Sequence, residues 1–288
     1  MTAALEWPEP DVDENLLGVI GWPVEHSLSP VIHTAAFEDL GMRGWRYVHL
    51  PVQPGGMAAA AERLVSKGYR GANVTMPHKE SAFELSLPVD DDVTRLRAVN
   101  TLVVDAATSQ ITGHNTDVQG FEEFLGHEAG FDPRGKTALI FGAGGAARAC
   151  ALSLARSGAG TIVVAARDPS KADALRETVS NFPAELRVVA WGEAGDEEAN
   201  LVLNATPVGS DGGRVPLPRL GSETVAVDLV YSRAVTPMLE SARAAGAPAF
   251  GGLGLLVRQA ALSFELWTGR APSLEAMRAA AEDAVGAA

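Results

Sequence analysis

Short apolar runs rich in β-branched residues alternate with longer helical patterns along the first third of the chain. Residues 16–21, 45–52 and 71–76 are predicted to be buried strands, because their apolar positions run on without a helical period. A helix is expected after the first of them, with Ser29 as its N-cap and Pro30 at its first position. Such alternation predicts a parallel or mixed sheet with helices on its faces.

A second α/β unit is expected to begin at Asp117. Residues 118–130 have a helical pattern, and residues 137–158 read as a strand, a glycine turn and a helix. Further apolar strands follow up to about residue 230. From residue 254 onward the pattern is helical again, and its periodicity alone does not say which unit these helices cover.

Composition narrows the class of protein. The chain has 288 residues, of which 47% are hydrophobic, and a formal net charge of −13, which argues against general nucleic-acid binding. No apolar run is long enough to suggest a membrane span. The first fifteen residues are acidic and rich in proline, so a flexible tail over residues 1–15 is expected.

Cysteine and histidine usage excludes two further kinds of site. The single cysteine, Cys150, permits no intramolecular disulfide and favours a reducing cytoplasm; its apolar helical context predicts a buried structural thiol. The six histidines show neither a HExxH pattern nor short paired spacing, and no CxxC motif is present. No metal is therefore expected.

The glycine turn GAGGAA, residues 142–147, lies between a predicted strand and an alanine-rich helix. Gly142 allows a tight turn, Gly144 lets the backbone approach a pyrophosphate, and Ala147 permits close packing of helix on strand. The free N–H groups of the helix N-terminus would face the phosphates. This arrangement predicts dinucleotide binding.

The next strand bears on the choice between NADP and NAD. It ends at Ala166 without the carboxylate that would hold the ribose hydroxyl of NAD. Arg167 and Lys171 follow, and both suit a 2′-phosphate. Asp168 opposes this interpretation, because its carboxylate would repel a phosphate or hold a ribose hydroxyl. NADP is predicted, with NAD left open by Asp168.

Polar side chains stand at the ends of several predicted strands. Lys79 lies just past the strand over residues 71–76. Comparable places are taken by Ser27, Ser29, Asn100, Thr101 and Asp117. Because ligands of open α/β sheets bind outside the carboxyl ends of the strands, these residues predict a polar pocket.

Seven motifs together resemble the shikimate dehydrogenase family. They are GWPVEHSLSPVIH, GANVTMPHKE, AVNT, GHNTD, GAGGAAR, NATPVG and GGLGLLVRQA, and the similarity covers roughly residues 16–275. The resemblance implies an α/β fold of two domains: a substrate domain over residues 16–116 and 254–288, with a mainly parallel mixed sheet, and a Rossmann-like NADP domain over residues 117–253. It also implies NADPH-dependent reduction of 3-dehydroshikimate to shikimate in aromatic amino-acid and chorismate biosynthesis.

Site residues follow from the resemblance position by position. It implies Lys79 and Asp117 as the catalytic pair. The implied substrate ligands are Ser27, Ser29 and Tyr231 for the carboxylate, and Thr75, Asn100 and Gln259 for the ring hydroxyls. The implied cofactor ligands are Gly142, Ala143, Gly144, Gly145, Ala146, Arg167, Lys171, Thr206 and Gly252.

Two departures keep alternatives open. Many NADP-using members carry Asn-Arg-Thr where this chain has Ala166-Arg167-Asp168, so a quinate/shikimate or aminoshikimate dehydrogenase using NAD is the nearest rival. In the family, an aspartate commonly stands directly before the glycine that corresponds to Gly252, and in this chain that position is Gly251. A non-catalytic NADP sensor is a further rival, although both Lys79 and Asp117 are present. The sequence leaves open whether the protein is a monomer or a homodimer.

Overall fold

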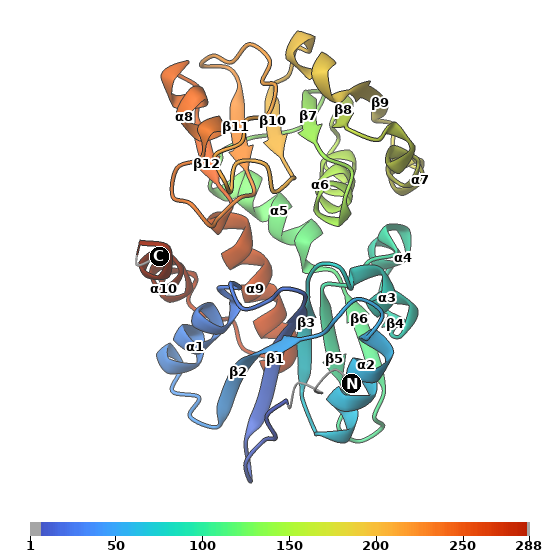
Figure 1. Cartoon of the computed structure of the whole chain (residues 1–288), viewed down its shortest axis with the longest axis vertical. Helices are drawn as coiled ribbons and strands as arrows, with labels where there is room; N and C mark the ends of the chain where they lie inside the picture. The colour runs from blue at the N-terminus through green and yellow to red at the C-terminus, as the bar shows by residue number, and fades with distance from the viewer. Residues whose placement is uncertain (1–6, 287–288) are drawn as a thin grey trace. The chain divides into compact units, whose positions relative to one another are not determined.

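The computed structural model describes residues 7–286, and the side chains of Pro169 and Lys171 lie outside that description. The chain divides into two compact units. The first runs up to Thr116 and regains Ala260–Ala284, and the second comprises Asp117–Gln259. The second division thus falls between Gln259 and Ala260, well inside helix α9 (Leu253–Thr268), whereas the expected division at residue 254 is at the first turn of that helix. Figure 1 shows the elements of each unit.

The first unit is built on a six-stranded mixed sheet with the order β2-β1-β3-β5-β6-β4. β1 pairs in parallel with β2 and β3, whereas β5 runs antiparallel to both β3 and β6. Its elements are β1 (Asn15–Gly21), α1 (Ser29–Asp39), β2 (Trp45–Pro51), α2 (Met57–Ser66), β3 (Gly71–Val74), α3 (Lys79–Glu84), β4 (Leu87–Pro88), α4 (Asp91–Leu96), β5 (Thr101–Val104), β6 (Ile111–His114) and α10 (Leu274–Gly286).

The two faces of this sheet differ in chemistry. Along β3, Ala72 and Val74 belong to an apolar core that includes Leu64 of α2. Asn73 points to the opposite face, because successive side chains of a strand alternate. There its amide nitrogen meets Ser263 of α9 at 2.9 Å. One face is therefore an apolar core, and the other carries a buried polar group.

The expectation of a flexible tail is wrong for residues 7–14, and the first six residues lie outside the described part. Trp7 is only 4% exposed and its ring lies 5.7 Å from that of Tyr69. The Tyr69 hydroxyl donates to the carbonyl of Pro8 at 2.8 Å, and Arg46 pairs with Glu14 at 2.7 Å. Burial of one tryptophan outweighs the acidic, proline-rich composition of the segment.

The second unit contains a six-stranded, wholly parallel sheet with the order β12-β11-β10-β7-β8-β9. Counted from β7, this is the 3-2-1-4-5-6 order of the doubly wound dinucleotide-binding fold. Its elements are α5 (Thr116–His127), β7 (Thr137–Phe141), α6 (Gly145–Arg156), β8 (Thr161–Ala166), η1 (Pro169–Ala172), α7 (Asp173–Val179), β9 (Glu185–Ala190), η2 (Trp191–Asp196), β10 (Leu201–Asn204), β11 (Val225–Asp228), α8 (Pro237–Ala244) and β12 (Ala249–Gly251).

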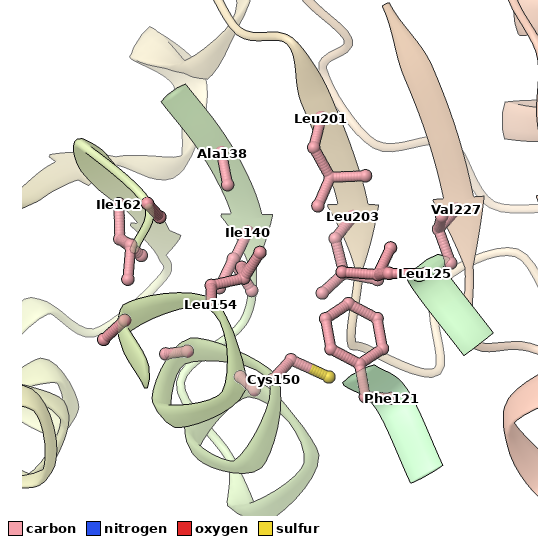
Figure 2. Packing of buried hydrophobic residues seen from close by; sticks show 14 of the residues in the cluster. Phe121, Leu125, Ala138, Ile140, Cys150, Leu154, Ile162, Leu201, Leu203 and Val227 are labelled. Atoms are coloured by element: carbon pink, nitrogen blue, oxygen red, sulfur yellow. The ribbon is translucent and has the colours of Figure 1, made fainter. Parts of the chain in front are cut away.

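Both faces of the second sheet are covered by apolar side chains. On one face Ile140 and Leu203 pack against Phe121 of α5 and Leu154 of α6, as Figure 2 shows. On the other, a cluster around Leu139 and Phe141 contains Met238 of α8. Cys150 is 1% exposed within the first of these clusters. This position confirms the prediction of a buried structural thiol.

Candidate active site

The segment that carries Lys79 is anchored by its neighbours. His78 is buried, and its Nε2 lies 2.7 Å from the carbonyl oxygen of Val52. The backbone N–H of Thr75 donates to Ile20 at 2.8 Å, which keeps this residue at the end of β3. Lys79 is the first residue of α3, half-buried, and its carbonyl accepts from the N–H of Val99 at 2.9 Å. The backbone of Lys79 is therefore fixed between β3 and the start of β5.

Ser27 and Ser29 lie together before α1, although not in the predicted capping arrangement. The helix begins one residue earlier than expected, with Leu28 as its N-cap and no side-chain cap hydrogen bond. The reason is local: Ser27 Oγ accepts from the N–H of Ser29 at 3.3 Å and lies 3.1 Å from Ser29 Oγ. The structure thus brings both predicted hydroxyls to one turn, with Ser29 only 5% exposed.

Asn100 lies directly before β5, and its side chain is hydrogen-bonded to Thr116, the residue before Asp117. Its Oδ1 accepts from the backbone N–H of Thr116 at 2.9 Å, and its Nδ2 donates to the Thr116 hydroxyl at 3.0 Å. Its backbone carbonyl also accepts from Val74 at 2.7 Å. Thr116 closes the first unit, and Asp117, half-buried, opens the second. Asn100 is 2% exposed, so these hydrogen bonds are shielded from water.

A polar network behind these residues was not anticipated from the sequence. Tyr47 donates to Asn73 Oδ1 at 2.7 Å, and the Asn73 amide donates to Thr101 Oγ1 at 3.0 Å. Burial raises the pKa of Tyr47 well above its ordinary value, which keeps this phenol a donor. The available sequence indication was Asn73 itself, a polar residue inside the fully buried strand GANV.

The predicted dinucleotide turn sits where the strand order of the second sheet reverses. Gly142 follows β7 with φ of +107°, which favours glycine, and a Cβ there would lie 2.8 Å from Thr206 Cγ2. Gly144 caps α6 and is exposed, and a Cβ there would meet no protein atom within 4 Å. Gly145 and Ala146 begin the 12-residue α6, with Ala143 half-buried in the turn. The turn fits a pyrophosphate at a helix N-terminus.

Arg167 and Asp168 follow β8 and have different environments. Arg167 is exposed, as a phosphate ligand has to be. Asp168 Oδ1 accepts from both the N–H and the hydroxyl of Ser170, at 3.1 and 2.6 Å, and caps η1. The carboxylate therefore has a local partner in the next turn of the chain. The side chain of Lys171 lies outside the described part, so its role as a phosphate ligand stays a prediction.

A second unanticipated network supports Thr206 and the segment of Tyr231. Asn204 Oδ1 accepts from the N–H and hydroxyl of Thr206, at 3.1 and 2.7 Å, and its Nδ2 donates to Asp228 at 2.9 Å. Asp228 also accepts from the N–H of Val230 at 3.1 Å and from the Thr236 hydroxyl at 2.6 Å. The available sequence indication of this network was Asp228, an acidic residue at the end of the apolar strand VAVD.

The remaining predicted residues also lie in the second unit. Burial raises the pKa of the Tyr231 phenol above its ordinary value, so it stays protonated. Gly252 packs against the backbone of Leu229, where a Cβ would lie 2.3 Å from the carbonyl oxygen. Gln259, 9% exposed on α9, donates to Leu256 at 2.9 Å. The first unit thus assembles Ser27, Ser29, Thr75, Lys79 and Asn100, and the second assembles the cofactor turn, Thr206, Tyr231 and Gly252.

Residues 7–286 contain neither a candidate metal site nor a candidate membrane-spanning helix. No group of three or more His, Cys, Asp and Glu side chains in this part is arranged to hold a metal ion. No helix in the same described part is both long and apolar enough to span a bilayer.

The strand order, the glycine turn and the helix that follows it define a doubly wound dinucleotide-binding domain joined to a second α/β unit. Two family models match the chain. The shikimate dehydrogenase substrate binding domain matches residues 19–102, and the shikimate 5′-dehydrogenase C-terminal domain matches residues 252–282. The chain is also 41% identical to a shikimate dehydrogenase (NADP+) from Methanopyrus kandleri, over 94% of this chain and 96% of that one. It belongs to the shikimate dehydrogenase family.

Solved structures agree with this assignment. Shikimate 5-dehydrogenase from Thermus thermophilus, crystallised with NADP(H) and shikimate, is 37% identical, covers 94% of this chain and 99% of its own, and gives a TM-score of 0.83. A quinate dehydrogenase from Corynebacterium glutamicum with NAD gives a TM-score of 0.84 at 30% identity, covering 93% and 98%. The fold is therefore shared by enzymes named for different substrates, and the choice among them depends on residues.

Proposed function

We propose that this protein is an NADP-dependent shikimate dehydrogenase, an oxidoreductase that interconverts 3-dehydroshikimate and shikimate in chorismate and aromatic amino-acid biosynthesis. The observation that carries the proposal is the anchored Lys79. Its backbone is fixed between β3 and β5, beside the buried Asn100, in a chain 41% identical to a shikimate dehydrogenase (NADP+). A relative of known structure, from Thermus thermophilus, binds shikimate with NADP(H) on the same fold.

Substrate recognition is assigned to short polar groups. Ser27 and Ser29, paired at 3.1 Å, would hold the carboxylate through their hydroxyls. Tyr231, whose phenol stays protonated, would donate to the same carboxylate. Thr75 and Asn100 would bind ring hydroxyls, and Gln259 would join them. A small, densely hydroxylated acid needs such a set, because each of its polar groups must find a partner when it leaves water.

Proton transfer is assigned to Lys79. The cofactor supplies the hydride to the ketone carbon of 3-dehydroshikimate when it is bound. A protonated Lys79 polarises the ketone oxygen and gives it a proton, so that the new C–O–H group is neutral. Asp117 orients the ammonium group and holds the product hydroxyl. General acid catalysis of this kind contributes roughly 10²–10⁴ in rate.

NADP is favoured over NAD by the surroundings of Arg167. A 2′-phosphate needs an accessible guanidinium and no unpartnered carboxylate beside it. Arg167 is exposed, while Asp168 accepts two hydrogen bonds from Ser170. Lys171 is proposed as a second phosphate ligand. Gly142, Ala143, Gly144, Gly145 and Ala146 would hold the pyrophosphate, with Thr206 and Gly252 near the nicotinamide ribose.

Location and assembly remain proposals of the same kind. The single cysteine is buried and makes no disulfide, which suits a reducing cytoplasm. We propose a monomer or homodimer that needs neither nucleic acid nor membrane.

The decisive test pairs shikimate and quinate with NADP+ and NAD+ in initial-rate oxidation at one pH. Shikimate with NADP+ should give the highest kcat/KM. In parallel, Arg167→Ala should raise the KM for NADP+ and leave kcat with NAD+ unchanged, whereas Arg134→Ala, a surface arginine paired with Asp132, should change neither. Faster turnover of quinate with NAD+ would instead identify the rival quinate/shikimate enzyme and make Asp168 a ribose ligand.

A further inference from the structure

Ser263 lies at the centre of the buried polar network of the first unit. It is on α9 and is 0% exposed. Its Oγ lies 2.9 Å from Asn73 Nδ2, 2.8 Å from Thr101 Oγ1 and 3.2 Å from Thr116 Oγ1. These partners come from β3, from β5 and from the residue that precedes Asp117. A single hydroxyl therefore links α9 to three segments that carry proposed substrate and catalytic residues.

The direction of these hydrogen bonds can be worked out by counting donors and acceptors. The N–H of Thr116 can only donate, so the Asn100 atom 2.9 Å from it is the oxygen. The Thr101 hydroxyl donates to the same oxygen at 2.9 Å. Ser263 then donates to Thr101 and accepts from the Asn73 amide and the Thr116 hydroxyl. This arrangement gives Ser263 Oγ one donated and two accepted hydrogen bonds, and the N–H of Thr116 fixes which end of the Asn100 amide is the nitrogen.

We propose that Ser263 is a positioning residue, which holds the Asn100 amide and Thr116 in the orientation that substrate binding and proton transfer require. This inference rests on the proposed function. Removing the hydroxyl would take one acceptor from the Asn73 amide, which keeps Thr101 Oγ1 and the Asn100 carbonyl at 3.0 and 3.1 Å. The Thr116 hydroxyl would lose its acceptor on Ser263 and would have to donate to Asn100 Oδ1, 3.3 Å away. Water cannot easily replace the Ser263 hydroxyl, because Asn100 and Thr101 are 2% and 0% exposed. The hydroxyls of Thr101 and Thr116 both contact the Asn100 amide, so their rearrangement would turn that amide away from the ring hydroxyls.

The test compares Ser263→Ala with a matched control, Ser153→Ala. Ser153 also lies on a helix and is 1% exposed, but its buried hydroxyl has no hydrogen-bond partner within the described part of the chain. Ser263→Ala should lower kcat/KM for shikimate about tenfold and leave the KM for NADP+ unchanged. Ser153→Ala should leave both unchanged.

A double variant separates positioning from mere stability. If Ser263 acts through Asn100, its removal should cost little more in kcat/KM once Asn100 is already alanine, because directly coupled residues are not additive. The proposal is overturned if Ser263→Ala lowers the free energy of unfolding but leaves kcat/KM for shikimate unchanged. It is also overturned if the fold-reductions in kcat/KM caused by Ser263→Ala and by Asn100→Ala simply multiply in the double variant.

One outcome concerns the proposed function alone. If the unmodified protein does not oxidise shikimate, the proposed function fails, and a crystal structure of the Ser263→Ala variant then decides the positioning role. A turned Asn100 amide would support it, and an Asn100 amide placed as in the unmodified protein would overturn it.

Discussion

Lys79 shows how much of one residue's role depends on its backbone. His78, directly before it, is hydrogen-bonded to Val52, the residue after β2, and the strand β3 a few residues earlier pairs with β1 and β5. The side chain is half-buried and the carbonyl is held by Val99. A lysine on this fixed support can present its ammonium group reproducibly, which proton transfer demands.

The first prediction concerns this residue. Lys79→Ala should lower kcat by roughly 10²–10⁴ and raise the KM for shikimate far less, because the proton transfer is lost and most substrate contacts remain. Steady-state kinetics of shikimate oxidation measures both constants. Lys67→Ala, which removes a surface lysine paired with Glu9, is the control and should leave kcat unchanged. A large rise in KM with kcat preserved would make Lys79 a binding residue only.

His33 gives a prediction about pH. It is fully buried, its ring stacks 4.3 Å from that of Tyr47, and neither ring nitrogen has a hydrogen-bond partner within the described residues. Burial lowers the pKa of His33 from 6.5 to about 3. Between pH 6.5 and about 3, the unfolded chain therefore binds a proton at His33 that the folded chain does not bind. The free energy of unfolding should fall as the pH falls through this range.

The slope from this one residue should approach about 1.4 kcal/mol per pH unit. His33→Leu should remove that slope and keep or increase the stability at pH 7, since two unsatisfied nitrogens disappear. Urea unfolding at several pH values between 7 and 4.5 measures it. The exposed His26→Gln variant should keep the original slope. An unchanged pH dependence in His33→Leu would refute the assignment.

At the scale of elements, polar residues at the ends of β10 and β11 hold the loops that follow. Asn204 and Asp228 face each other in register across the two strands. Between them they accept hydrogen bonds from Thr206, Val230 and Thr236. The Thr206 turn and the Tyr231 segment are thus supported by one buried pair.

Asp228→Asn should lower the free energy of unfolding by about 1–3 kcal/mol, because an amide cannot accept at both positions where the carboxylate does. The KM for NADP+ should rise as the Thr206 turn loosens. Chemical denaturation and steady-state kinetics measure these effects. Asp211→Asn is the control, since Asp211 is exposed and accepts only from Gly213 among the contacts described. Equal behaviour of the two variants would contradict a supporting role.

The segment before β1 behaves as part of the first unit, and a substitution can check this. Trp7→Ala should cost about 3–5 kcal/mol, the usual range for truncating a large buried side chain. Val12→Ala in the same segment should cost less than about 0.5 kcal/mol, because Val12 is 94% exposed. Urea denaturation compares the two. A Trp7→Ala variant as stable as the parent would instead support the flexible tail expected from the sequence.

At the scale of the whole molecule, the two units have separate cores, and the second is assigned the cofactor while the first is assigned most of the substrate ligands. NADP+ alone should slow hydrogen exchange around residues 142–146 and 204–206, and shikimate alone should slow it around residues 27–29 and 75–79. Exchange followed by mass spectrometry of peptides resolves these segments. Protection by NADP+ confined to the first unit would contradict the assignment of the cofactor turn.

The sequence by itself determined much of this protein. Apolar periodicity located the strands β1, β2 and β3 to within a few residues, because burial on a pleated sheet dictates that pattern. The glycine turn predicted its own strand-turn-helix context, because the tight turn at Gly142 requires a positive φ. The family followed from motifs read in order. All of these are properties of neighbouring residues.

Only the tertiary structure decided which polar groups meet. Asn73 and Ser263 are separated by 190 positions and yet lie 2.9 Å apart. Their pairing depends on the sheet order and on the packing of α9, which local periodicity does not encode. The same holds for Trp7, whose burial depends on Tyr69. A side chain's residue type sets the hydrogen bonds it can make, and the fold sets the partners within its reach.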